Sequence, residues 1–358
     1  MRFWLFALGC VSMLGQVVLL REVSVACSGA ELVLVLALGV WMVAVALGAL
    51  AVRRERHGHE RDVRRSFLLF AVLLAGALLL LRGARRLLHA VPGSSLPFPT
   101  QMLVLGVCLA PVAGVLGMLF VRCARRYAAF HGTLARGYAL ESAGGLAGGA
   151  AATLLLAAGV PNLHAAGFCA ALGCAAAAWP WRRRAAAATL PAALALLLLA
   201  GTLGGGSRLD RWSTGWNHPR LLATRDTPYG RVTLTEAAGQ VAVFEDDALV
   251  SESQSTAGEA FVHVAAVQRD AIGRVLVLGG AVPGLLPHVL AHGPEVVDDV
   301  ELSSRVLELV TAHGGAALQQ ARADPRLHVH LGDPRRFLSR AGIYDLVLVG
   351  MPEPESAR

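Results

Sequence analysis

The sequence predicts a polytopic α-helical membrane domain, then a small β-hairpin region and an α/β domain with a mostly parallel sheet. Of its 358 residues, 55% are hydrophobic, which is high for a soluble protein. Long apolar runs fill the first half, and strand and helix patterns alternate near the C-terminus. Charge divides in the same way, with 18 Arg and 6 acidic residues in 1–206 but 14 Arg and 19 acidic residues in 207–358.

The excess of basic residues therefore belongs to the membrane half, where Arg clusters between apolar runs set topology. The acidic second half argues against a nucleic-acid partner. All six Cys lie in the membrane half, and no Cys or His spacing is typical of zinc. We expect no metal site and no disulfide in the second half.

Seven apolar runs of spanning or near-spanning length predict a transmembrane domain over residues 1–203, with the lipid bilayer as its partner. The third run and the Ala-rich sixth run are the weakest. The runs are 3–20, 31–52, 66–81, 100–120, 138–158, 163–180 and 186–203.

Arg-rich segments between the runs predict the topology of a multi-pass cell-membrane protein. Six Arg lie in 53–65, four in 121–137 and three in 181–184, and the positive-inside rule makes all three segments cytoplasmic. Strict alternation over seven spans then places the second half outside. A nucleotide-type site favours the cytoplasm instead, and one span more or fewer reverses the result, so both alternatives stay open.

A Gly-rich and then aromatic stretch, 204–227, is expected to be a linker. Residues 228–256 alternate with period two around an Ala-Ala-Gly turn and an Asp246-Asp247 turn, which predicts a β-hairpin region. Residues 257–268 are typical of a helix and begin the last domain, 257–358.

That domain has the βαβ pattern of a Rossmann-like, S-adenosylmethionine-methyltransferase-type fold. Strands alternating with helices indicate a parallel sheet with right-handed crossovers. The expected strands are 274–279, 296–302, 327–331 and 344–349, and the expected helices are 284–292, 303–313 and 334–340.

A nucleoside site is expected where the first strand of this domain ends. Gly279, Gly280 and Gly284 allow a ligand to approach the backbone closely, and the N–H groups of the next helix start would face it. Glu301 ends the second strand, where an acid accepts hydrogen bonds from ribose hydroxyls. Asp333 ends the third strand, at the base-binding rim. The alternatives are a solvated acid for Glu301 and a helix N-cap for Asp333.

Several segments of residues 228–353 resemble one enzyme family, the polyamine aminopropyltransferases or spermidine synthases. Gly15-Gln-Val-Val-Leu-Leu-Arg-Glu22 resembles the membrane-spanning members of that family. The segments are Pro228-Tyr-Gly-Arg-Val-Thr-Leu-Thr-Glu236, Glu259-Ala-Phe-Val-His263, Val275-Leu-Val-Leu-Gly-Gly280, Val300-Glu-Leu302, Gly332-Asp333 and Tyr344-Asp-Leu-Val-Leu-Val-Gly-Met-Pro-Glu-Pro354.

The resemblance implies aminopropyl transfer from decarboxylated S-adenosylmethionine, as co-substrate, to a diamine such as putrescine. No prosthetic group or metal is implied, because the sulfonium is already an activated leaving group. The implied partners are thus a nucleoside and a polyamine, and a homodimer is left open.

Key acids of the family are replaced. Val282 stands where the family's glycine turn has the Asp that holds the aminopropyl ammonium, and Gly350 stands where the family has the Asp that deprotonates the amine. Ala257-Gly258 stands where the family has a Tyr-His or Tyr-Gln pair. Glu353 is the remaining acid expected near the amine, and it is the catalytic candidate. Removal of a general base costs about two to four decades of rate.

Only eight residues follow Gly350, whereas the family fold continues, so the last domain is expected to be incomplete and the chain truncated. Two functions remain open. One is a membrane-bound spermidine synthase-like enzyme. The other is a catalytically inactive relative that acts as a nucleoside-binding or membrane interaction module. Methyl transfer would use the same half-fold, but the hairpin region argues against it.

Overall fold

The structure, a computed structural model, describes residues 2–55, 59–130, 132–179 and 186–351. These residues form two compact units, each described here by itself. The helical unit comprises 2–91 and 95–217, and the α/β unit comprises 92–94 and 218–351, within the described ranges.

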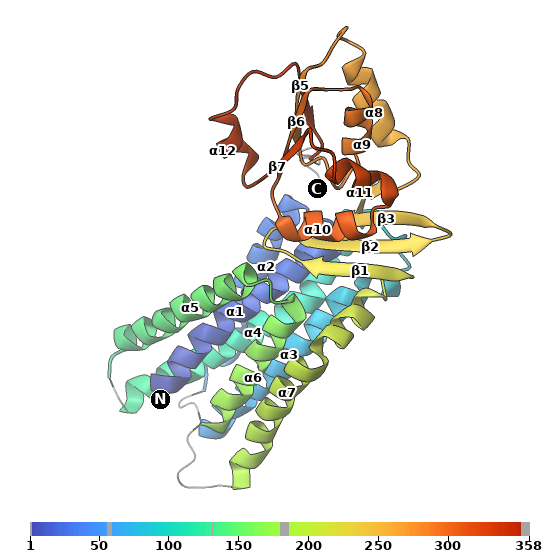
Figure 1. The fold of residues 1–358 in the computed structure, drawn as a ribbon. Coiled ribbons are helices and arrows are strands. Elements are labelled where there is room, and N and C mark those ends of the chain that lie inside the picture. The colour runs from blue at the N-terminus through green and yellow to red at the C-terminus, as the bar shows by residue number, and fades with distance from the viewer. Residues whose placement is uncertain (1, 56–58, 131, 180–185, 352–358) are drawn as a thin grey trace. The chain divides into compact units, whose positions relative to one another are not determined.

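Helices of the helical unit coincide with all seven expected apolar runs (Figure 1). Six of them are long and apolar enough to cross a membrane, whereas the Ala-rich sixth helix has only 17 residues. The expected third span lies within a helix of 28 residues. The helices are α1 (Arg2–Ala26), α2 (Glu31–Ala51), α3 (Glu60–Leu87), α4 (Phe98–Phe130), α5 (Leu134–Ala157), α6 (Asn162–Ala178) and α7 (Ala186–Thr214).

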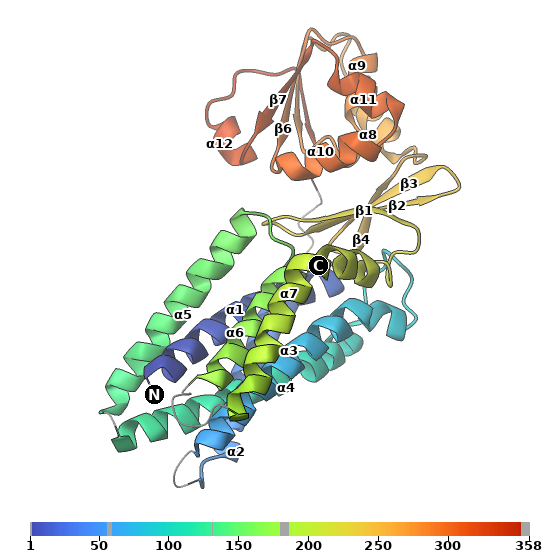
Figure 2. The same ribbon diagram turned by 60° about the horizontal axis from the view of Figure 1, so that its bottom comes forward.

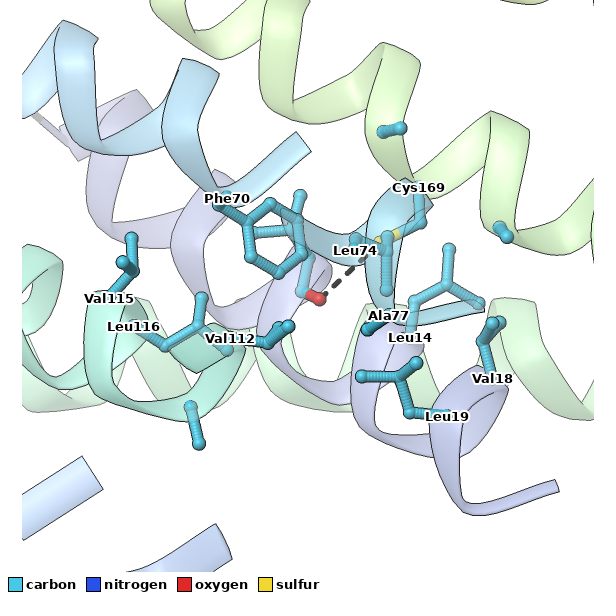
Figure 3. Packing of buried hydrophobic residues seen from close by; sticks show 14 of the residues in the cluster. Leu14, Val18, Leu19, Phe70, Leu74, Ala77, Val112, Val115, Leu116 and Cys169 are labelled. Atoms are coloured by element: carbon cyan, nitrogen blue, oxygen red, sulfur yellow. Dashed lines mark hydrogen bonds between the residues drawn. The ribbon is translucent and has the colours of Figure 1, made fainter. Parts of the chain in front are cut away.

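The core of this unit is apolar, and side chains from several helices converge in it (Figure 3). Leu14 of α1, Phe70 and Leu74 of α3 and Val112 of α4 are all 5% exposed or less. Small residues bring α1 and α5 into close contact, because a Cβ on Gly144 would lie 2.0 Å from the Phe6 carbonyl oxygen. Such contacts are typical of helices that pack in membranes.

The segment expected to be a linker, 204–227, is mostly regular structure. Helix α7 continues through its glycines to Thr214, and residues 221–226 form a strand. The prediction was wrong because glycine only weakens a helix, by about 1 kcal/mol, and tertiary contacts override that cost. Here Asp210 and Ser213 near the end of α7 both bind Arg82 of α3.

Arg82 lies at the centre of a buried polar network in the helical unit. Its guanidinium contacts the Glu22 carboxylate at 3.0 Å and the Asp210 carboxylate at 2.7 Å, and its Nη1 donates to Ser213 Oγ at 2.7 Å. The second oxygen of Glu22 accepts from the Asn162 side chain at 2.7 Å. The Arg82 cation of α3 thus joins α1 and α7 directly, and α6 through the Glu22 carboxylate.

We predict that Arg82→Ala lowers the free energy of unfolding by about 3–5 kcal/mol, because the buried Glu22 carboxylate and the partly buried Asp210 carboxylate lose their counter-charge. Thermal unfolding in detergent measures this. Arg65→Ala is the control. The Arg65 side chain is 80% exposed and comes no closer than 4.0 Å to the Asp62 carboxylate, so its removal should cost under about 1 kcal/mol. Equal effects of the two variants would contradict the prediction.

The α/β unit begins with a four-stranded antiparallel sheet in the order β1-β2-β3-β4. The hairpin region predicted its last three strands, and β1 was missed. Asp246 and Asp247 take positive φ values of 46° and 59° in the expected turn between the last two. The strands are β1 (Leu221–Asp226), β2 (Arg231–Ala237), β3 (Gln240–Glu245) and β4 (Ala248–Glu252).

The second sheet of the unit is parallel, in the order β7-β6-β5-β8, as the alternation predicted. Helices α8 to α11 cover one of its faces and α12 lies against the other (Figures 1 and 2). Only the short α11 was not expected. The elements are α8 (Ala257–Ala266), β5 (Arg274–Leu278), α9 (Leu286–Ala291), β6 (Val296–Glu301), α10 (Ser304–His313), α11 (Ala316–Arg322), β7 (Leu327–Leu331), α12 (Pro334–Leu338) and β8 (Leu346–Val349).

Candidate functional site

A cavity of about 230 Å³ lies within the α/β unit, where β5, β6 and β8 end and the antiparallel sheet faces them. Ligands of open parallel sheets bind at this edge, outside the carboxyl ends of the strands. Residues of its lining include Tyr229, Arg231, Glu245, Gly279, Val282, Glu301, Ser303 and Gly350. Two of the predicted site residues, Gly279 and Glu301, are therefore at the cavity.

The glycine turn after β5 is bound to the protein rather than open to a ligand. The Gly279 N–H donates to the Val300 carbonyl at 3.0 Å, the Gly280 N–H to Asp299 Oδ1 at 3.4 Å and the Ala281 N–H to Glu301 Oε1 at 2.8 Å. These three N–H groups of the turn are used within the protein, because β6 supplies carboxylates directly below the turn. That the N–H groups at the start of the next helix face a ligand stays a prediction. Gly279 has a φ of +75°, a left-handed conformation that glycine adopts more readily than any residue with a side chain.

Two acids on one face of β6 support this turn. Asp299 is fully buried and Glu301 is 5% exposed. Burial raises the pKa of both carboxyl groups, and the charge of Glu301 raises that of Asp299 further. Backbone N–H groups of the turn hold the Glu301 carboxylate, Ala281 donating to its Oε1 at 2.8 Å, while Glu301 also lines the cavity.

The other predicted site residues lie differently. Asp333 is exposed and caps α12, accepting from the Arg335 N–H at 2.9 Å, so the N-cap alternative describes it. Gly280 and Gly284 belong to the turn, where Gly284 has a φ of +69°, but they are outside the cavity lining. Glu353 lies outside the described residues.

Acidic groups predominate among the titratable groups at the cavity. The Arg231 guanidinium is paired with Asp226 at 2.7 Å, and both side chains are buried. Glu245 at the end of β3 was not expected at the site, and it adds a second carboxylate beside Glu301. Period-two alternation along β3 could have found it, since Val241, Val243 and Glu245 share one face. Such a site favours a ligand with positive charge.

Gly350 is packed so closely that a side chain does not fit. A Cβ on it would lie 2.5 Å from the Gly279 carbonyl oxygen and 3.0 Å from Leu285 and Pro283 side-chain atoms. Its N–H donates to the Leu278 carbonyl at 2.9 Å, which holds it against β5. An acid at this position therefore requires the backbone to move.

We predict that Gly350→Ala lowers stability by about 1–3 kcal/mol, the usual cost of overpacking. Hydrogen exchange of β5 and β8 measures the loss. Gly342→Ala is the control, because its nearest contact would be an ordinary 3.6 Å to the Arg274 side chain. Unchanged protection in Gly350→Ala would show that this end of β8 adapts without cost.

No model of a known protein family matches this chain. Several curated polyamine aminopropyltransferases are similar to it. That of Nitrosococcus oceani is 30% identical over 139 residues, which cover 37% of this chain and 49% of the relative. That of Clostridium acetobutylicum is 33% identical over 99 residues, covering 27% and 35%. The spermine synthase of Arabidopsis thaliana is 28% identical over 137 residues, covering 37% and 36%.

The chain thus spans about half the length, or less, of the curated relatives it matches. Among solved structures, a spermidine synthase in complex with the transition-state analogue AdoDATO has a TM-score of 0.35 and 19% identity. The match covers 38% of this chain and 48% of that one. Similarity to the spermidine synthases is therefore found in part of the chain.

Proposed function

We propose that the α/β unit binds an S-adenosyl nucleoside and that the chain is a membrane-bound relative of the spermidine synthases. The observation that carries this proposal is the cavity at the ends of the parallel strands, with Gly279 and Glu301 in its wall. Glu301 there can accept a hydrogen bond from a ribose hydroxyl. The similarity to curated aminopropyltransferases supports the same ligand class.

The reaction proposed is aminopropyl transfer from decarboxylated S-adenosylmethionine to a diamine. The lone pair of the amine attacks the aminopropyl carbon next to sulfur, the C–S bond breaks, and neutral methylthioadenosine leaves. The attacking nitrogen must lose a proton, so a base near it accelerates the step. A dicationic substrate also needs carboxylates to replace its hydration.

A catalytically silent relative is the second candidate. Val282 has no charge to offer an ammonium group, and Gly350 has no room for an acid. Both changes weaken catalysis while the nucleoside side of the cavity persists. Such a protein would bind the nucleoside without turning it over.

We predict that the full-length protein in detergent binds both decarboxylated S-adenosylmethionine and methylthioadenosine, measured by calorimetry. In an aminopropyl-transfer assay its turnover should lie about two to four decades below that of an active spermidine synthase, because the usual base is missing.

No heat from either nucleoside would refute the proposed ligand class. Turnover equal to that of an active enzyme would refute the silent alternative. Glu301→Gln is the matched variant. If the Glu301 carboxylate accepts a hydrogen bond from the ribose, this variant should bind both nucleosides about tenfold more weakly.

We propose further that the chain lies in the cell membrane, with the bilayer as its partner and the α/β unit in the cytoplasm. The six long apolar helices support the first part, and the cytoplasmic origin of S-adenosyl nucleosides supports the second. The positive-inside rule applied to seven spans argues for the opposite side.

Fusion reporters distinguish the two sides. We expect a fluorescent protein fused after Asn217 to fluoresce and a phosphatase fused there to be inactive. A fusion after Arg54, within an Arg-rich segment, is the cytoplasmic control. An active phosphatase after Asn217 would place the α/β unit outside.

A further inference from the structure

Glu245 is the last residue of β3, and its side chain lies on the strand face that points into the α/β unit. Val241 and Val243, on the same face, pack against the core of that unit. Glu245 is thus the third residue on this face, an acid where a third valine would continue the pattern. The Asp246-Asp247 turn follows it directly. Glu245 thereby reaches the cavity wall.

Within the described part of the chain, the Glu245 carboxylate has no hydrogen-bond or ion-pair partner. The other charged or titratable groups in the cavity lining are Tyr229, Arg231 and Glu301, and Asp246 is the neighbour along the chain. Arg231 is already paired with Asp226 at 2.7 Å. A partly buried carboxylate without a partner is costly, and a bound cation would remove that cost.

We propose that Glu245 binds the positive charge of the nucleoside substrate, and so makes the cavity selective for a cationic nucleoside over a neutral thioether nucleoside. This inference rests on the proposed nucleoside site. Glu245 takes over a task for which Val282 and Gly350 provide no carboxylate, and it does so from the antiparallel sheet instead of the glycine turn.

Proton release follows from the position of Glu245. Burial raises its pKa to about 7, and the charges of Asp246 and Glu301 contribute. The group is therefore mostly protonated at pH 6 and mostly ionised at pH 8. A cation binds the ionised form, so its affinity rises with pH across this range and binding near pH 7 releases a proton to solvent. A neutral nucleoside has no such dependence on Glu245.

Calorimetry on the full-length protein in detergent tests this with decarboxylated S-adenosylmethionine and methylthioadenosine at pH 6 and pH 8. Glu245→Gln should weaken the cationic nucleoside at pH 8 by about tenfold or more, the range for a charge-assisted contact, and change methylthioadenosine by less than about twofold. Glu236→Gln, an exposed acid on the neighbouring strand β2, is the matched control and should behave as the unmodified protein.

The pH series is a second test that needs no variant. Affinity of the unmodified protein for the cationic nucleoside should rise about tenfold from pH 6 to pH 8, as expected for a group that titrates near pH 7. Glu245→Gln should abolish that rise. Asp299 is unchanged in this variant, so a lost pH dependence would be due to Glu245 and not to Asp299.

Two outcomes overturn the inference alone: both nucleosides bind, but Glu245→Gln weakens them equally or not at all, or the affinity ratio of the two is the same at pH 6 and pH 8. If Glu245→Gln fails to fold, the pH series on the unmodified protein decides. If neither nucleoside binds the unmodified protein, the proposed function fails and this inference fails with it.

Discussion

The hydrogen bond from the Ala281 N–H to the Glu301 carboxylate, at 2.8 Å, holds the glycine turn against β6, and the candidate site is arranged around it. With Asp299 below Gly280, it places two acids where many nucleotide-binding folds leave free N–H groups for a pyrophosphate. The N–H groups of Gly279, Gly280 and Ala281 are used internally, and Glu245 and Glu301 add carboxyl groups to the cavity wall. Both facts disfavour a dinucleotide and favour a nucleoside with a positive charge.

Much of the fold could be predicted from the sequence because its signals are local. The apolar runs are long enough to be helices wherever they pack, and the strand at Val275 is a short apolar segment between turn signals. Gly279 and Glu301 follow from the βαβ pattern and line the cavity, and their role in binding a ligand stays a prediction. The sequence allowed Asp333 to be either a base-binding residue or a helix N-cap. The hydrogen bond from the Arg335 N–H shows that it caps α12.

Features that depend on distant partners could not be predicted. Gly204 to Gly206 are helical because Arg82, more than a hundred positions earlier, binds Asp210 and Ser213 of the same helix. β1 has no strong strand signal of its own and is fixed by pairing with β2, including the buried contact of Asp226 with Arg231. Alternation along β3 places Glu245 on the inward face with Val241 and Val243, but it does not show that a cavity lies at the end of that strand.

Val282 and Gly350, the two positions at which the sequence predicts replaced family acids, lie on either side of one proline. Pro283 follows Val282 in the turn, and its ring occupies the space beside Gly350, where a Cβ would lie 3.0 Å from the Pro283 Cγ. The carbonyl oxygen of Gly279, 2.5 Å from the same point, closes the space from the other side. An acid could not be restored at 350 while this turn keeps its residues. The Gly350 position itself therefore has no space for an acid, and Glu245 on β3 brings a carboxylate to the cavity from outside the parallel sheet.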